Sequence, residues 1–199
     1  MDQLEAEQIQ PLWQWSTEIG TAIVDLLSFG TGRGYITIID RLEMPDGKTG
    51  IPDFFDPRLA ALCNFFDDGA KVAQAVELMV SDGNIRRALH DLVQCLSWPD
   101  VAPINCARAV EAIRHRVAGP QQRGDQWKIL RERLNIDKSY LDLIINISKE
   151  RRHGNRITIA PGAGSEATVR SWTIMHRFID YLFRGESPLP LDQFPILSA

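Results

Sequence analysis

The apolar residues of this chain follow a helical period over most of its length, and this spacing limits the fold more than any other feature of the sequence. Apolar side chains recur every three or four positions, as they do along one face of an α-helix. Breaks such as Ser97-Trp-Pro-Asp100 separate these runs. The spacing predicts helices over 54–66, 71–80, 84–96, 103–117 and 166–184.

Two further helices are expected between residues 120 and 156. The first is short and charged, with Trp127, Leu130 and Leu134 on one side. The second is capped by Asp137, and Gly154 follows it as a stop. At the start of the 84–96 run, Asn84 is a suitable N-cap. The long helical part should therefore form a bundle.

The first fifty residues carry a different signal. Residues 21–27 and 35–39 are rich in branched side chains, and a glycine-rich segment separates them. Asp46-Gly47 adds a turn of the type favoured between strands. We therefore expect a small antiparallel β unit over roughly 13–52, with a helix over 14–28 as the alternative. The expected fold class is α+β, with a β-rich segment at 1–53, a helical bundle at 54–185 and a proline-containing tail at 186–199.

Composition restricts the kinds of function that are open to the chain. The 199 residues are 44% hydrophobic and carry a net charge of −4, which indicates a globular protein without a broad basic surface. No apolar run is long enough to cross a membrane, and the acidic N-terminus does not resemble a secretory signal. The isolated cysteines Cys63, Cys95 and Cys106 suggest buried thiols in a reducing compartment. The expected location is the cytoplasm.

The strongest local concentration of positive charge lies at residues 149–156. An apolar helix runs into Lys149-Glu-Arg-Arg-His-Gly-Asn-Arg156, where four cations offset one glutamate. Cations at the C-terminus of a helix interact favourably with the helix dipole, which is a purely structural explanation. The functional alternative is a phosphate or RNA site built on Arg152 and His153, with Lys149, Arg151 and Arg156 as further phosphate contacts. We expect no metal and no cofactor, because the histidines lack ligand spacing.

The order of helices from about residue 84 to residue 183 resembles the HEPN-like superfamily of prokaryotic helical domains. The resemblance rests on Ala88-Leu-His-Asp-Leu-Val-Gln-Cys-Leu96, Ala107-Arg-Ala-Val-Glu-Ala-Ile113, Trp127-x-x-Leu130 and the closing Arg152-His-Gly154. It implies a metal-independent endoribonuclease of a defence or toxin–antitoxin type system, in which two protomers pair. In that scheme His153 moves the proton of a ribose hydroxyl, and Arg152 holds the phosphate.

The chain departs from the superfamily motif, in which four to six intervening residues separate an arginine from a following histidine. Counting back from His153 gives Asn146, Ile147 and Ser148, and none of these is an arginine. The literal match is Arg170-x5-His176, so these residues are secondary candidates together with Arg114 and His115. Two functions therefore stay open. The first is RNA binding or cleavage, and the second is a noncatalytic module for dimerisation or for docking a protein partner.

Overall fold

The computed structural model describes residues 6–33, 36–43, 47, 49–50, 57–62, 68–98, 101–152 and 163–199. Helix accounts for 72% of the interpretable part and strand for 3%, so the protein is mainly α-helical. The expected α+β class is wrong. The chain divides into two compact units, Met1–Phe54 and Phe55–Ala199, and each is described by itself.

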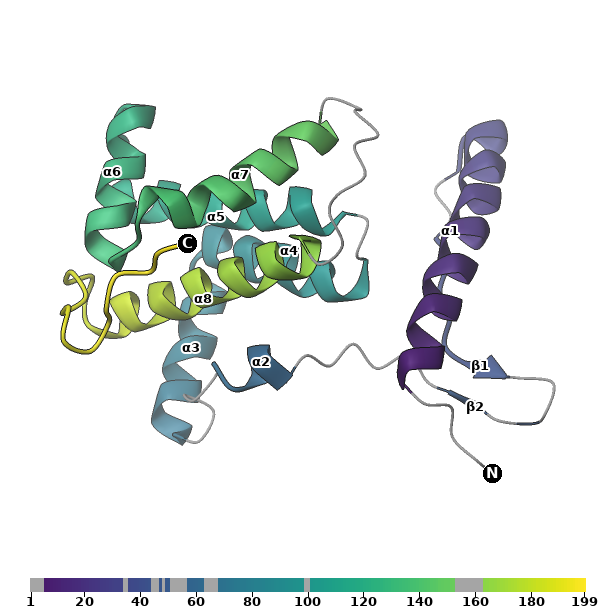
Figure 1. Ribbon diagram of the computed structural model, residues 1–199, viewed down its shortest axis with the longest axis horizontal. Helices are drawn as coiled ribbons and strands as arrows, with labels where there is room; N and C mark the ends of the chain where they lie inside the picture. Colours follow the sequence, from purple (N-terminus) through teal and green to yellow (C-terminus); the bar gives the residue numbers. More distant parts are fainter. Residues whose placement is uncertain are drawn as a thin grey trace. The chain divides into compact units, whose positions relative to one another are not determined.

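The larger unit is a helical bundle in which α5 is the central element (Figure 1). Helix α5 packs against α4, α6, α7 and α8, and the short α2 and α3 lie against α8 and α4. Helices α7 and α8 pack on each other and run in opposite directions. The bounds are α2 Pro57–Ala60, α3 Gly69–Ser81, α4 Gly83–Ser97, α5 Ala102–Ala118, α6 Arg123–Leu134, α7 Lys138–Arg152 and α8 Ala163–Phe183.

The helices of this bundle lie close to the runs of apolar residues that predicted them. One face of each long helix is buried in a common core, because hydrophobic side chains leave water most completely when the faces meet. The expected helix at 54–66 is described only in part, because residues 54–56 and 63–66 lie outside the described residues. The fully buried members of the core include Ile85, Leu92, Val110, Ile113, Leu130, Leu134, Ile144, Ile174, Phe178 and Tyr181.

Aspartate side chains begin three of the helices. Asp68 accepts from the backbone N–H of Ala70 at 3.0 Å at the start of α3, and Asp137 accepts from Ser139 N–H at 3.0 Å before α7. Helix α4 is capped by Asp82, which accepts from the N–H of Asn84 at 2.8 Å. The prediction that Asn84 is this cap is wrong, because the helix begins one residue before it, at Gly83. The Asp137 cap is confirmed.

The C-terminal segment 186–199 packs against the ends of α6 and α8. The amide of Asn135 donates to the carbonyls of Leu189 at 2.8 Å and Phe194 at 3.0 Å, and Arg177 donates to that of Pro195 at 2.6 Å. Leu189 is buried. Asn135 itself has φ 53° as the C-cap of α6, a left-handed conformation that asparagine tolerates better than most residues. These contacts hold the tail on the bundle.

The N-terminal unit is organised around a long helix, α1, at Ala6–Thr31. The β-rich unit expected at 13–52 is therefore wrong, and the helical alternative over 14–28 describes the chain. The branched residues at 21–27 favour strands only weakly, and the packing of α1 overrides that preference. One face of α1 buries Trp13 and Thr17, and a Cβ added at Gly20 would lie 3.1 Å from the methyl group of Thr37.

A short strand pair is the remaining regular structure in the described part of this unit. Strand β1 at Leu42–Glu43 pairs antiparallel with β2 at Thr49–Gly50, in the register Leu42 to Gly50. The two strands flank the Asp46-Gly47 signal, and Gly47 has φ 83°. The chain therefore reverses direction between β1 and β2, and each strand is only two residues long.

Candidate nucleic-acid interface

The C-terminal turn of α7 carries the cations that the sequence singled out. Lys149 is exposed, and Arg151 and Arg152 are the last two residues of the helix. The apolar residues that precede them explain this placement, because Tyr140, Leu141 and Ile144 are buried and fix α7 on the bundle. His153 and Arg156 lie outside the described residues, as do the orientations of the Arg151 and Arg152 side chains.

A further cation, Arg58, contacts the start of α8. Arg58 of α2 is exposed, and its Nη2 donates to Ser165 Oγ at 2.8 Å in the first turn of α8. Because α7 and α8 run in opposite directions, the last turn of α7 and the first turn of α8 lie toward the same end of the bundle (Figure 1). We call Arg58, Lys149, Arg151 and Arg152 the basic end. The dipole of α8 adds positive potential there.

Arg170, the arginine of the literal motif match, is held inside the bundle. Its Nε donates to Glu166 Oε1 at 2.8 Å, and its guanidinium lies 4.8 Å from the centre of the Tyr140 ring. The side chain is 13% exposed. These contacts join the first half of α8 to the start of α7, so the surroundings of Arg170 are those of a packing residue.

His176, the histidine of the same match, has a separate environment. Its Nδ1 lies 3.3 Å from Asp180 Oδ2, one turn further along α8, and its side chain is 17% exposed. Burial lowers the pKa of His176, although the carboxylate of Asp180 raises it. The carboxylate of Asp180 thus lies against the Nδ1 side of the imidazole. A spacing of six residues also sets His176 about a third of a turn from Arg170 around the helix.

Arg114, a secondary candidate, is buried. Its guanidinium lies 4.5 Å from the centre of the Trp127 ring, and its Nη2 is 2.8 Å from His115 Nε2. Burial lowers the pKa of Arg114. Its Nε and Nη1 have no hydrogen-bond partner among the described residues. His115 is exposed. Arg114 thus joins α5 to α6 instead of facing solvent.

The other arginines on and near α5 have acidic neighbours. Arg108 Nη2 is 3.3 Å from Asp91 Oδ1, and Arg123 Nη2 is 4.0 Å from Glu111 Oε1. Arg116 bridges two acids, with Nε 2.7 Å from Asp82 and Nη2 2.5 Å from Glu186. These hydrogen bonds raise the pKa of Arg116 above its ordinary range. The α5 arginines therefore do not form a free basic patch.

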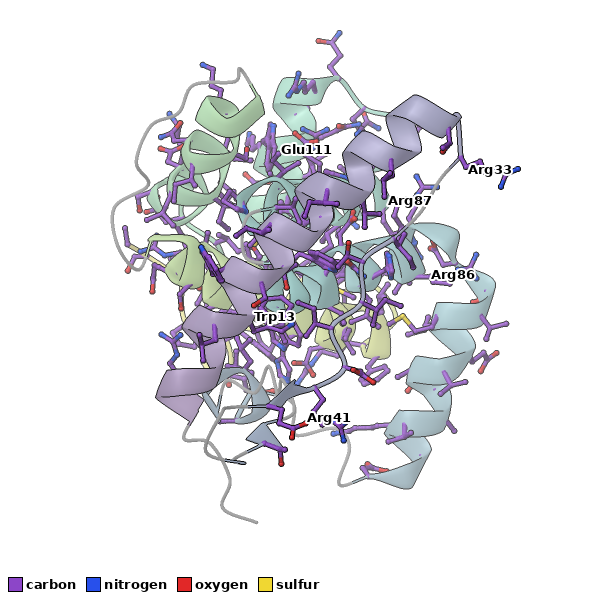
Figure 2. The ribbon with its side chains drawn as sticks, turned by 90° about the vertical axis from the view of Figure 1, so that its right-hand side faces the viewer. Trp13, Arg33, Arg41, Arg86, Arg87 and Glu111 are labelled. Atoms are coloured by element: carbon purple, nitrogen blue, oxygen red, sulfur yellow. The ribbon has the colours of Figure 1, made fainter. Side chains whose placement is uncertain are left out.

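A small basic surface on α4 was missed at the level of sequence. Arg86 and Arg87 are exposed on α4 (Figure 2). His90, one turn after Arg86, is exposed as well. Helical spacing alone could have placed them together, because the opposite face of α4 carries the buried Ile85, Ala88 and Leu92.

Within the described ranges, no group of three or more histidine, cysteine or acidic side chains is arranged to hold a metal ion. No helix in the described portions of the chain is both long and apolar enough to cross a bilayer.

The fold defines an all-helical bundle with a basic end and a separate N-terminal helical unit. Residues 71–183 match the family model described as the Domain of unknown function (DUF8168) C-terminal domain. The chain belongs to this family, and the matched region contains α4 to α8 completely. Comparison with curated proteins gives no match, and comparison with solved structures gives none.

Proposed function

We propose that the helical unit is a HEPN-like module that binds RNA through the basic end. The observation that carries this proposal is the last turn of α7, where Lys149, Arg151 and Arg152 follow one another closely. By contrast, the arginines of α5 and the first half of α8 are paired with acids or stacked on rings. The last turn of α7 differs from these positions because three cations fall within four residues there.

Several closely spaced cations suit a polyanion better than a single small anion. Lysine and arginine bind phosphate oxygens without reading the base, so such a surface grips a strand of RNA through its backbone. Because the whole chain carries a net charge of −4, RNA binding would be confined to this local basic surface. In the proposed complex, Lys149, Arg151 and Arg152 contact successive phosphates, and Arg156 extends the same surface.

Cleavage is the second part of the proposal and depends on one histidine. His153 directly follows the basic turn, so a phosphate held by Arg152 would bring a ribose hydroxyl near its imidazole. Arg170 and His176 are weaker candidates. They lie on one continuous helix, and Arg170 is engaged by Glu166 and by Tyr140.

Binding is tested by fluorescence anisotropy with labelled single-stranded RNA over a range of salt concentrations. Removing Lys149, Arg151 and Arg152 together by alanine substitution should weaken binding and reduce the slope of log K against log salt by about 2, since each lost phosphate contact removes about 0.7. Lys128→Ala is the matched control, because Lys128 is an exposed lysine of α6 paired with Glu132. Equal effects of the two changes would refute the basic end as the binding surface.

Cleavage is tested by incubating the protein with mixed RNA in EDTA. We expect activity that survives chelation and is lost in His153→Ala, while His90→Ala keeps it, because His90 is an exposed histidine on a different helix. Binding without cleavage would leave the interface proposal standing and remove the nuclease.

A second candidate function is noncatalytic dimerisation or partner docking. It is favoured by a specific observation in the N-terminal unit, where α1 exposes several large apolar side chains. This function does not exclude RNA binding, because the residues concerned belong to a different unit of the chain.

A further inference from the structure

Helix α1 exposes a continuous line of large apolar side chains. Trp15 is 64% exposed, Ile19 43%, Ile23 56% and Leu27 55%. They follow at intervals of four, so they form one ridge that winds slowly around the helix. We call these four residues the α1 ridge. Scattered apolar residues are normal on a surface, but an ordered line of them marks an interaction site.

The ridge is distinct from the face of α1 that is already packed. Trp13 and Thr17 are buried, and Gly20 lies against Thr37 of the following extended segment (Figure 2 labels Trp13). At 3.6 residues per turn, the ridge begins nearly opposite Trp13 at Trp15 and winds to within about 40° of the Trp13 direction at Leu27. The N-terminal unit therefore buries Trp13 and Thr17 and leaves the four side chains of the α1 ridge exposed.

We propose that the α1 ridge is the interface through which two copies of this chain pair. A ridge with a spacing of four fits the groove beside the same ridge on an identical helix, which is the commonest way that helices pack in globular proteins. An interface that uses the same patch on both partners closes after two copies. The homodimer expected from the sequence thereby gains a defined surface.

The area of the ridge is consistent with a dimer of modest stability. Given the exposed fractions of its side chains, the ridge presents about 450 Å² of surface, so two copies would bury about 900 Å² before flanking atoms are counted. A specific interface needs roughly 1,000 Å² in total. Flanking residues such as Leu12, which is partly exposed, would supply the remainder.

The test is the mass of the full-length protein in solution, measured by sedimentation or light scattering over a series of concentrations. We expect a concentration-dependent dimer, and Ile23→Glu should raise its dissociation constant at least about tenfold, because a charge at the ridge would be desolvated. The matched control is Ile38→Glu, since Ile38 is 76% exposed but lies on the extended segment instead of α1. It should leave the dimer intact. Circular dichroism checks that both variants keep their helix content.

Two results would overturn the proposal. One is a wild-type chain that stays monomeric throughout the concentration series. The other is a dimer that Ile23→Glu and Ile38→Glu weaken equally, because the contact would then not depend on the ridge. A mixture of Ile23→Lys and Ile23→Glu copies, or of Ile23→Lys and Ile19→Glu copies, should restore pairing where the substituted residues meet. RNA binding by the basic end can be measured on the same variants, so the failure of either proposal is seen separately.

Discussion

Arg177 should be among the most important single side chains for the stability of the bundle. It is 7% exposed, and its Nη1 donates to the carbonyls of Leu134 at 2.9 Å and Asn135 at 2.8 Å, while Nη2 donates to that of Pro195 at 2.6 Å. The guanidinium of Arg177 thus binds the carbonyls at the C-terminal end of α6 and holds the segment 186–199 on the bundle. Burial lowers the pKa of Arg177, but arginine stays charged at every pH of interest.

The change to test is Arg177→Met, which keeps an apolar stem and removes the guanidinium. Charged hydrogen bonds stabilise by about 1.5–3 kcal/mol each, and the relief of burying the charge offsets part of that sum. We expect a net loss of about 3 kcal/mol in the free energy of unfolding, because three carbonyls lose their donor. For a chain of this size, the melting temperature should fall by roughly 6–12 °C.

The measurement is urea unfolding followed by far-ultraviolet circular dichroism. Arg184→Met is the matched control, because Arg184 also contacts the tail, through Gln193 at 2.5 Å and over the Phe194 ring at 5.3 Å, but is exposed. It should cost less than about 0.5 kcal/mol. A loss below about 1 kcal/mol for Arg177→Met, or equal losses for both variants, would refute the role of Arg177 as a buried fastener.

Two further predictions concern a helix cap and a histidine. Asp82→Ala should cost about 1–2 kcal/mol in urea unfolding, because it removes both the α4 cap and the ion pair with Arg116, whereas Asp68→Ala removes an exposed cap alone and should cost about 0.5–1 kcal/mol. The reverse order of these losses would contradict the reasoning. Burial lowers the pKa of His176 in the folded protein, despite the neighbouring Asp180. The unfolded chain therefore binds a proton at this histidine more readily than the folded chain does. The contribution of His176 to stability is present above its unfolded pKa and is lost as the pH falls toward its folded pKa. Stability should therefore drop between about pH 7.5 and 5.5, and His176→Gln should reduce that drop; an unchanged pH dependence in the variant would count against it.

The helical unit was predictable because its signal is long and repeated. Helices α3, α4, α5, α6 and α8 lie close to the runs of apolar residues that predicted them. The apolar residues recur at helical spacing because one face of the helix is buried in the core. The N-terminal unit was not predictable in the same way. Branched residues at 21–27 occur in both strands and helices, and α1 buries the polar Thr17 beside Trp13 while it exposes Trp15, Ile19, Ile23 and Leu27. Apolar residues spread around a helix in this way do not give a clean helical period.

The candidate site was predictable in its charges but not in their partners. The sequence located Lys149, Arg151 and Arg152 at a helix end, and α7 does end at Arg152. It could not reveal that Arg114 would lie on Trp127, because that contact joins two helices whose packing is set by the whole core. Pairings between distant residues such as Arg58 and Ser165 depend on tertiary structure in the same way.

Arginine in this bundle is first of all a packing residue, and this explains why an arginine–histidine spacing is a poor guide to its chemistry. Arg114, Arg170 and Arg177 each lie close to an aromatic ring, at 4.5, 4.8 and 5.9 Å, and bury most of their length between helices. A guanidinium is planar and weakly hydrated, so it can fill such positions where lysine cannot. Arg170 and His176 match the spacing but have separate structural partners. Tyr140 fixes Arg170, and Asp180 orients His176. The RNA-binding proposal therefore rests on the three cations in the last turn of α7 and not on an arginine–histidine spacing.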